Sequence, residues 1–463
     1  MSRPSLLVLG AGPAGLACAD ALASAGAAPS LIERDLQPGG LCRTVRYKDC
    51  YFDIGGHRFL SDSPEVNAIW SEVMGEDLLR VRRRSRIFYQ GRFFDYPLRP
   101  LNALAGLGPV EAARCLASYA ASRLGPAAMG EDFDSWMSSR FGRRLFETFF
   151  KTYTEKVWGI PCSQLSSDWA QERVRGLSLG RAVRKALWPP AAGERSLSEE
   201  FYYPRRGPGQ FCERYAERAR RNGALLEYGR PVLSVLREGE RVAAVLLGDA
   251  RGGVERRDCS EVFSSIPITA LVGKIHPPPP PSVLEACARL SFRHFITVNL
   301  IYEHGESFPD NWIYVHAPEV PFGRVQNYRN WSADMVPSER LTTLGVEYFV
   351  SAQDPIWSME ESELVRRSAV ELDRMGLAPH RALREGFAVR VANAYPVYRV
   401  GYREPLNTVL DYLRSIPNLH LAGRAGLFRY DNSDQALLSG LGAARAYLRK
   451  ERPSPALEEV VYA

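Results

Sequence analysis

The chain begins with a short apolar run that is followed by small residues. Leu6–Leu9 are four consecutive apolar positions, a pattern typical of a strand buried on both faces. Leu16–Ala25 is rich in alanine and predicts a helix, and Pro29–Ile32 predicts a second strand. Strand, helix and strand in this order predict a parallel β-sheet covered by helices, that is, an α/β fold.

The pattern changes several times further along the chain. Residues 98–207 are largely helical in pattern, 205–265 return to strands and a helix, and alternating segments between 292 and 351 predict an antiparallel sheet. A last strand and helix follow after residue 418. These changes predict three parts. A discontinuous α/β domain consists of residues 1–75, 205–265 and 386–463. A mainly helical substrate lobe covers residues 76–204, and an antiparallel-sheet substrate domain covers residues 266–385.

Three glycines lie between the first predicted strand and the helix, in the spacing G-x-G-x-x-G. Gly10 permits a tight turn, Gly12 lets a pyrophosphate approach the backbone, and Gly15 lets the helix lie close to the sheet. Glu33 follows the second predicted strand, 18 residues after Gly15, where a carboxylate can accept hydrogen bonds from a ribose. Together these features predict a dinucleotide site.

A second glycine turn distinguishes between dinucleotides. Glu33, Gly39, Gly40 and Thr44 follow one another within twelve residues. This segment resembles the E-x3-5-G-G-x3-T signature of FAD proteins related to amine oxidases, phytoene desaturases, protoporphyrinogen oxidase and UDP-galactopyranose mutase. The resemblance implies that the cofactor is FAD and that the discontinuous domain is a Rossmann-like FAD-binding domain. Further predicted cofactor-binding residues in this segment are Arg34, Leu41 and Arg43.

A third glycine turn follows the predicted strand at 49–54. Gly55 and Gly56 allow the backbone to come close to a ligand, so both are predicted to contact the cofactor. His57 comes directly after them and is predicted to lie against the flavin ring. A purely structural histidine is the alternative.

Composition is consistent with an anionic ligand and excludes few classes of protein. The 463 residues carry a net charge of +6, which suits an anionic cofactor and substrate. Basic and aromatic residues do not alternate in a stripe, so no nucleic-acid partner is expected. The eight cysteines are scattered without a C-x-x-C pair, the chain starts with a strand, and no apolar run is long enough to span a membrane. We therefore expect a cytoplasmic protein with reduced thiols, no transmembrane segment and no metal site.

The middle and the end of the chain carry a more specific resemblance. Residues 152–161 read T-Y-T-E-K-V-W-G-I-P, which is similar to the Y-x-E-K-x-W-x-x-P segment of UDP-galactopyranose mutases. The order of the motifs is also that of this family, and the likeness extends over nearly the whole chain. The other matching positions are 169–174, 203–210, 312–314, 321–324, Gly423, Arg424, Tyr430 and Asp434.

The resemblance implies roles for individual residues. Arg173 and Arg324 are implied to clamp a diphosphate with bidentate hydrogen bonds, and with His57 they are the predicted catalytic residues. Arg424 is implied to lie near the flavin, where a cation stabilises the reduced ring. Gly423 and Asp434 are further implied cofactor residues, and the remaining implied substrate-binding residues are Tyr96, Arg99, Trp312, Tyr314, Tyr395 and Tyr430. Ordinary packing is the alternative for Trp312 and the tyrosines.

The resemblance also implies a reaction. In the family, N5 of reduced FAD attacks the anomeric carbon of a nucleotide-diphosphate sugar, and the sugar ring opens and recloses between pyranose and furanose forms. NADPH or NADH is a possible reductant. The alternative is an FAD-dependent oxidoreductase of the amine oxidase or protoporphyrinogen oxidase type, which takes a hydride from its substrate. A third possibility is an FAD-binding protein without catalysis.

Departures from the family leave the substrate open. Arg99 stands where eukaryotic-type mutases carry glutamine, and residues 431–435 read D-N-S-D-Q where the family tends to show N-Q-D-H. Another sugar or another nucleotide therefore remains an alternative. Glu155 and Lys156 are expected to form a structural ion pair with each other. Oligomeric state cannot be predicted from these patterns.

Overall fold

The computed structural model describes residues 5–97, 106–124, 130–168, 199–303 and 307–450. At its centre is a parallel sheet with the strand order β20-β13-β1-β2-β9. These strands come from three distant parts of the chain: β1 (Leu6–Leu9), β2 (Ser30–Ile32), β9 (Leu225–Glu227), β13 (Glu261–Ser264) and β20 (Leu419–Leu421). The sequence-based prediction of an α/β fold with a discontinuous parallel-sheet domain is confirmed.

Alternate residues of β1 face two different layers. Leu6 and Val8 pack on helices α1 (Pro13–Ser24), α10 (Pro208–Arg221) and α16 (Ser433–Leu448). Leu7 and Leu9 pack toward a second sheet, which consists of β10 (Val232–Glu238), β11 (Arg241–Gly248), β12 (Val254–Asp258) and β14 (Ile275–His276). Period-two burial explains why all four residues of this strand are apolar.

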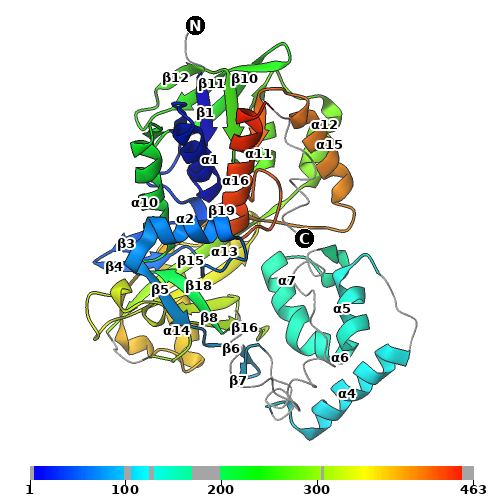
Figure 1. Cartoon of the computed structure of the whole chain (residues 1–463). Coiled ribbons are helices and arrows are strands. Elements are labelled where there is room, and N and C mark those ends of the chain that lie inside the picture. Colours follow the sequence, from blue (N-terminus) through cyan, green and yellow to red (C-terminus); the bar gives the residue numbers. More distant parts are fainter. Residues whose placement is uncertain (1–4, 98–105, 125–129, 169–198, 304–306, 451–463) are drawn as a thin grey trace.

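Helices α1 and α16 run side by side at the front of the parallel sheet (Figure 1). A Cβ atom on Gly440 of α16 would lie 2.0 Å from the carbonyl oxygen of Ala14 in α1. Only a residue without a side chain allows this approach, and the alanines of α1 keep the rest of the contact close.

A seven-stranded sheet forms the second half of the molecule, in the order β19-β15-β18-β17-β16-β6-β7. Its strands are β6 (Ser85–Tyr89), β7 (Arg92–Asp95), β15 (Phe292–Tyr302), β16 (Trp312–Val315), β17 (Arg324–Asn327), β18 (Thr342–Val350) and β19 (Leu383–Pro396). β6 and β7 form a hairpin that belongs to a segment predicted to be mainly helical. The hairpin joins this sheet because β6 pairs in parallel with β16.

A group of helices lies beside the seven-stranded sheet, at the lower right of Figure 1. It consists of α4 (Pro109–Leu124), α5 (Phe133–Phe141), α6 (Arg143–Phe146), a π-helical turn over Glu147–Lys151, and α7 (Thr152–Trp158). Arg293 of β15 fixes the end of α7: its Nε donates a hydrogen bond to the carbonyl oxygen of Val157 at 3.2 Å. A cation at the carboxyl end of a helix stabilises the helix, because it donates to backbone carbonyl groups that have no partner within the helix.

The remaining elements connect these layers. They are β3 (Thr44–Tyr47), β4 (Cys50–Asp53), α2 (Pro64–Met74), β5 (Leu78–Arg82), β8 (Glu200–Pro204), α11 (Ile268–Val272), α12 (Pro281–Arg289), α13 (Pro355–Ser358), α14 (Glu361–Arg374) and α15 (Arg403–Arg414). Within the described part of the chain, none of these helices combines the length and the apolar character needed to cross a bilayer.

Candidate functional site

One cavity lies where the carboxyl ends of the parallel strands meet the seven-stranded sheet. Its volume is about 650 Å³. Turns and strands that are far apart in the sequence provide its walls. The predicted site residues that line it are Gly10, Gly12, Glu33, Arg34, Gly40, Leu41, Arg43, Gly55, Gly56, His57, Trp312, Tyr314, Arg324, Tyr395, Gly423, Arg424 and Tyr430. The carboxyl edge of a parallel sheet is where α/β folds bind ligands.

Some predicted residues lie elsewhere. Gly15 and Gly39 support the cavity wall from behind, and Asp434 lies in the first turn of α16 without lining the cavity. Tyr96 also does not line it, but its ring lies 4.8 Å from that of Tyr314, which does. Arg99 and Arg173 fall outside the described residues.

The three glycines of the first turn have different surroundings. A Cβ atom on Gly12 would meet nothing within 4 Å, because this residue faces the cavity. A Cβ atom on Gly15 would lie 1.8 Å from the carbonyl oxygen of Gly10. Gly10 itself has φ +99°, a conformation that favours glycine. Gly15 is therefore required for packing, whereas Gly12 leaves space for a ligand.

The second glycine turn contacts the first. The backbone N–H of Gly39 donates a hydrogen bond of 2.8 Å to the carbonyl oxygen of Ala11, and a Cβ atom on Gly40 would lie 3.4 Å from Cα of Gly12. Glu33 fixes the same region, since its carboxylate accepts hydrogen bonds from the N–H groups of Ala11 at 2.7 Å and Asp35 at 3.0 Å. The result is a small concave surface of glycine backbone beside a carboxylate.

Arg424 provides hydrogen-bond donors at the other end of this surface. Its guanidinium lies 4.6 Å from the centre of the Tyr395 ring and 4.3 Å from that of Tyr430. Nη1 donates to the carbonyl oxygen of Asp431, whereas Nε and Nη2 are buried and have no hydrogen-bond partner among the described residues. Buried donors without partners are rare unless a ligand supplies the acceptor.

The residues present fit FAD. Gly12 and Gly40 leave room for a pyrophosphate, the carboxylate of Glu33 beside them would accept hydrogen bonds from a ribose, and the free donors of Arg424 would meet the oxygens of the flavin ring. The amino-terminal end of α16 also borders the cavity through Asn432 and Ser433. Its dipole favours negative charge on a bound ring.

His57 is held by its own turn. Its Nε2 lies 2.9 Å from the carbonyl oxygen of Ile54, so that nitrogen carries the hydrogen. Burial lowers the pKa of His57 to about 4, and the nearby charges of Arg424 and Arg324 act in the same direction. The imidazole is therefore neutral at physiological pH, with Nδ1 as an acceptor.

Arg324 does not stand alone in the cavity wall. Its Nε lies 2.5 Å from Oε2 of Glu347, a residue whose side chain is fully buried. Oε1 of Glu347 accepts further hydrogen bonds from Nε2 of Gln326 at 2.7 Å and from the N–H of Gly56 at 3.1 Å. Burial alone would lower the pKa of Arg324, but the charge of Glu347 holds it well above its usual value. The arginine predicted as a diphosphate clamp thus already has one carboxylate partner.

Aromatic rings form much of the remaining wall. The ring of Tyr314 lies 4.8 Å from that of Tyr96 and 6.3 Å from that of Trp312. Trp312 packs against Trp331 at 5.3 Å and also lines the cavity, so its packing role is observed and its contact with a ligand stays a prediction. Burial raises the pKa of Tyr395 to about 12, so its hydroxyl is protonated and accepts a hydrogen bond from Nη2 of Arg324 at 3.3 Å.

The expected ion pair between Glu155 and Lys156 is wrong. Nζ of Lys156 instead donates to the carbonyl oxygens of Val315 at 3.1 Å and Ala317 at 2.5 Å, and Glu155 accepts from the N–H of Cys162 at 3.1 Å. Adjacent residues on a helix point in different directions, so these two side chains reach different backbone groups. Both still act structurally, because they attach α7 to its neighbours.

Three residues of the site were missed by sequence reasoning: Glu347, Gln326 and Arg58. Glu347 could have been found, since it is a lone charge in the apolar run of β18, all of which is buried. Such a charge requires a buried partner. Gln326 and Arg58 carry no comparable signal in the sequence.

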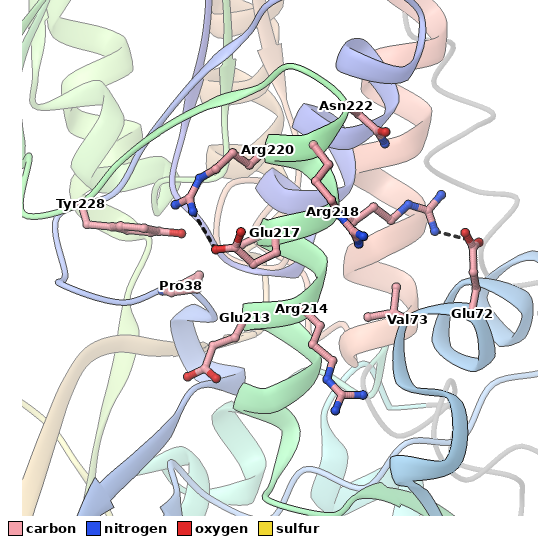
Figure 2. A pocket seen from close by; sticks show the side chains of 12 residues that line it. Pro38, Glu72, Val73, Glu213, Arg214, Glu217, Arg218, Arg220, Asn222 and Tyr228 are labelled. Carbon is pink, nitrogen blue, oxygen red and sulfur yellow. Dashed lines mark hydrogen bonds and ion pairs between the residues drawn. The ribbon is translucent and has the colours of Figure 1, made fainter.

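A second, wider hollow lies over α10 and has a volume of about 900 Å³ (Figure 2). Arginines line it, but carboxylates pair with three of them: Arg214 with Asp77, Arg218 with Glu72 at 2.8 Å, and Arg220 with Glu217 at 2.7 Å. The last two pairs are the dashed contacts in Figure 2. Exposed pairs of this kind make a solvated helix surface, and the hollow offers no buried donor without a partner.

Comparison with solved structures identifies the fold. Reduced UDP-galactopyranose mutase has a TM-score of 0.85 at 21% identity, with 99% of this chain and 96% of that chain covered. A protein from Exiguobacterium sp. 255-15 described as a protoporphyrinogen oxidase has a TM-score of 0.72 at 19% identity, with 97% and 100% covered. Cyclohexylamine oxidase from Brevibacterium oxydans IH-35A has a TM-score of 0.65 at 16% identity, with 97% and 99% covered.

These proteins perform different reactions on one fold, so the likeness does not assign a substrate. The sequence itself matches the family described as flavin containing amine oxidoreductase over residues 13–448. The match spans nearly the whole chain and includes Gly15, the later glycine turns at Gly39–Gly40 and Gly55–Gly56, Glu33 and Arg424. The chain therefore belongs to the flavin containing amine oxidoreductase family and is an FAD-dependent flavoprotein.

Proposed function

We propose that this flavoprotein acts on a nucleotide-diphosphate sugar and interconverts its pyranose and furanose forms. The observation that carries the proposal is the chemistry of the cavity wall beyond the FAD surface. Arg324 and Tyr395 stand there beside Trp312 and Tyr314, so a guanidinium adjoins aromatic and hydroxyl groups. A diphosphate needs guanidinium and hydroxyl donors, and a base or a sugar packs on aromatic rings.

The chain's own residues would bind and orient the substrate. Arg324 would donate to a phosphate oxygen, and its position is fixed by Glu347 and Tyr395. Neutral His57 offers an acceptor at Nδ1 for a hydroxyl group. Positioning of this kind accounts for a large share of catalysis when the cofactor carries the reactive atom. FAD, when bound and reduced, supplies a nucleophilic nitrogen for attack at an anomeric carbon.

The reductant in this proposal is NADPH or NADH. The sequence contains one complete dinucleotide fingerprint, at Gly10–Gly15. A nicotinamide cofactor would therefore bind transiently in the substrate part of the same cavity and leave before the sugar binds.

An FAD-dependent oxidation is the second candidate. The observation in its favour is Glu347, which already neutralises Arg324 and so weakens the attraction for an anion. The position of Arg424 argues against an amine substrate, because its guanidinium lies on the rings of Tyr395 and Tyr430. A cation in this position repels a substrate ammonium group from the aromatic pair.

Product analysis under anaerobic conditions tests the proposal. The purified holoenzyme is reduced with dithionite and incubated with UDP-, TDP- and GDP-sugars, and the nucleotide sugars are separated by chromatography. Oxidised enzyme is the control. An isomeric nucleotide sugar that forms only with reduced enzyme supports the mutase and identifies its substrate. Absence of any isomer, together with bleaching of the oxidised flavin by an amine or another reductant, contradicts it and supports the oxidase.

A further inference from the structure

The cations that line the cavity differ in how they are neutralised. Arg324 is paired with Glu347, Arg43 with Asp35, and Arg230 with Glu255. Arg58 lines the same cavity and is exposed. Among the described residues, no hydrogen bond or ion pair involves its side chain.

The backbone on both sides of Arg58 is fixed. The N–H of Gly56 donates to Glu347 at 3.1 Å, and Phe59 exchanges two backbone hydrogen bonds with Tyr202, at 2.9 and 3.0 Å. The ring of Phe59 is stacked on that of Trp70 at 3.9 Å. Arg58 is therefore presented from an ordered turn although its guanidinium has no partner.

The surroundings of Arg58 are aromatic and cationic. Its Cζ atom lies 6.0 Å from the centre of the Trp312 ring, and Cζ of Arg83 lies 5.4 Å from the same ring. Arg83 also lies 5.0 Å from the ring of Tyr96. Two guanidinium groups beside one indole raise the positive potential at this end of the cavity, and this potential favours the binding of an anion there.

We propose that Arg58 binds a phosphate group of the substrate at the Trp312 end of the cavity, with Arg83 contributing from the connection between β5 and β6. The identity of that phosphate as part of a nucleotide-diphosphate sugar rests on the proposed function, but the anion site itself does not. Trp312 holds the two cations in place, since Trp331 and Phe201 pack against it. Glu347 pairs with Arg324, whereas no carboxylate in the described part of the chain pairs with Arg58, so the charge of Arg58 is available to the phosphate.

Calorimetric titration of the oxidised holoenzyme tests the site. The probes are UDP, TDP, GDP, inorganic pyrophosphate and uridine, and the variant is Arg58→Gln. Arg46→Gln is the matched control, because Arg46 is exposed on β3, pairs with Asp49, and carries the same charge. A hydrogen bond between charged groups contributes enough that the variant should bind UDP and pyrophosphate about ten- to a hundredfold more weakly. Uridine has no phosphate, so its affinity should not change.

Thermal unfolding supplies a second readout. Apart from its distant contact with the Trp312 ring, Arg58 makes no hydrogen bond or ion pair with the described residues, so Arg58→Gln should unfold within roughly a degree of the wild-type temperature. A fall in the unfolding temperature together with loss of uridine binding would assign a structural role instead and overturn the proposal.

The outcomes separate the two proposals. If the wild-type protein binds pyrophosphate but none of UDP, TDP and GDP, and Arg58→Gln loses pyrophosphate, the anion site stands and the nucleotide-sugar function fails. If Arg58→Gln binds pyrophosphate and the nucleoside diphosphates like the wild type, or if the wild type binds none of them, the anion site is overturned.

Discussion

Arg324 and Glu347 face each other across neighbouring antiparallel strands, with Nε and Oε2 only 2.5 Å apart. The carboxylate has no exposed surface, and it also holds the turn at Gly56 that carries His57 and Arg58. One buried charge thus connects the two sides of the substrate cavity. The following predictions begin with this pair.

Glu347→Gln should destabilise the fold. The change leaves Arg324 without its carboxylate, and breaking a buried pair costs about 3–5 kcal/mol of the free energy of unfolding. Urea denaturation monitored by fluorescence measures this difference. Replacement of both residues, Arg324→Met with Glu347→Met, should recover much of the loss because no unpaired charge remains.

The control for this pair is Glu147→Gln, which breaks the exposed pair between Arg143 and Glu147. That change should cost less than about 1 kcal/mol, because surface pairs contribute little. Equal losses in the two single variants would show that Glu347 is not the buried partner that its geometry indicates.

Gly12→Val should prevent FAD binding and leave the protein folded. The new side chain would point into the cavity, where a Cβ atom meets nothing within 4 Å, and would occupy the space of the pyrophosphate. The φ of −70° at Gly12 suits any residue. The ratio of flavin to protein absorbance after purification and the far-ultraviolet circular dichroism measure the two effects.

Gly442→Ala is the matched control for Gly12. A Cβ atom there also meets nothing within 4 Å, but Gly442 lies in the middle of α16 and does not line the cavity. This variant should be yellow and slightly more stable, by up to about 1 kcal/mol, since alanine favours a helix. Full flavin content in Gly12→Val would contradict the assignment of the pyrophosphate position.

Asp53 should make stability depend on pH. Burial raises the pKa of this carboxyl from 3.8 to about 7, although Tyr203 and Thr44 donate hydrogen bonds to it. At a pH between these two pKa values, the folded chain keeps a proton on Asp53 that the unfolded chain releases. The contribution of protonated Asp53 to the free energy of unfolding is therefore fully present below pH 4. It is lost as the pH rises through 7, and the loss is about 4 kcal/mol at most.

Asp53→Asn should remove this slope. The amide keeps a polar group beside Tyr203 and Thr44 but does not titrate. Urea denaturation at several pH values from 4.5 to 8 gives the comparison. A wild-type free energy of unfolding that rises with pH in parallel with that of the variant would show that Asp53 is ionised in the folded protein.

Arg424→Met should lower the reduction potential of the bound flavin. Methionine preserves the contact with the tyrosine rings but removes the charge and the two buried donors. Loss of a charged hydrogen bond to the reduced ring corresponds to roughly 30–60 mV for a two-electron couple. Spectroelectrochemical titration measures the shift.

Arg424→Lys is the conservative control, and it should restore part of the potential because the charge remains. An unchanged potential in Arg424→Met would place this guanidinium away from the flavin ring. Loss of FAD from both variants would instead mean that Arg424 is needed for binding, and the apparent affinity for FAD would then be the quantity to compare.

The sequence by itself determined the parts of this protein whose physics is local. The strand at Leu6–Leu9, the helix after it and the second strand that ends at Ile32 follow from periodicity and turn residues within a few positions. The separate reasons for glycine at positions 10, 12 and 15 are a positive φ, space for a ligand and close packing, and all three follow from backbone geometry within one turn. The position of Glu33 beside this turn is also a local property, because the residue directly follows the strand next to the turn.

Only the tertiary structure decided which distant residues meet. Glu347 reaches Arg324 through the register of β17 and β18, and Arg58 reaches Trp312 because the same Glu347 holds the turn at Gly56 against this sheet. Lys156 binds carbonyl oxygens that lie about 160 residues away. Such contacts depend on strand order and register, which are set by the burial of whole faces and not by any short segment.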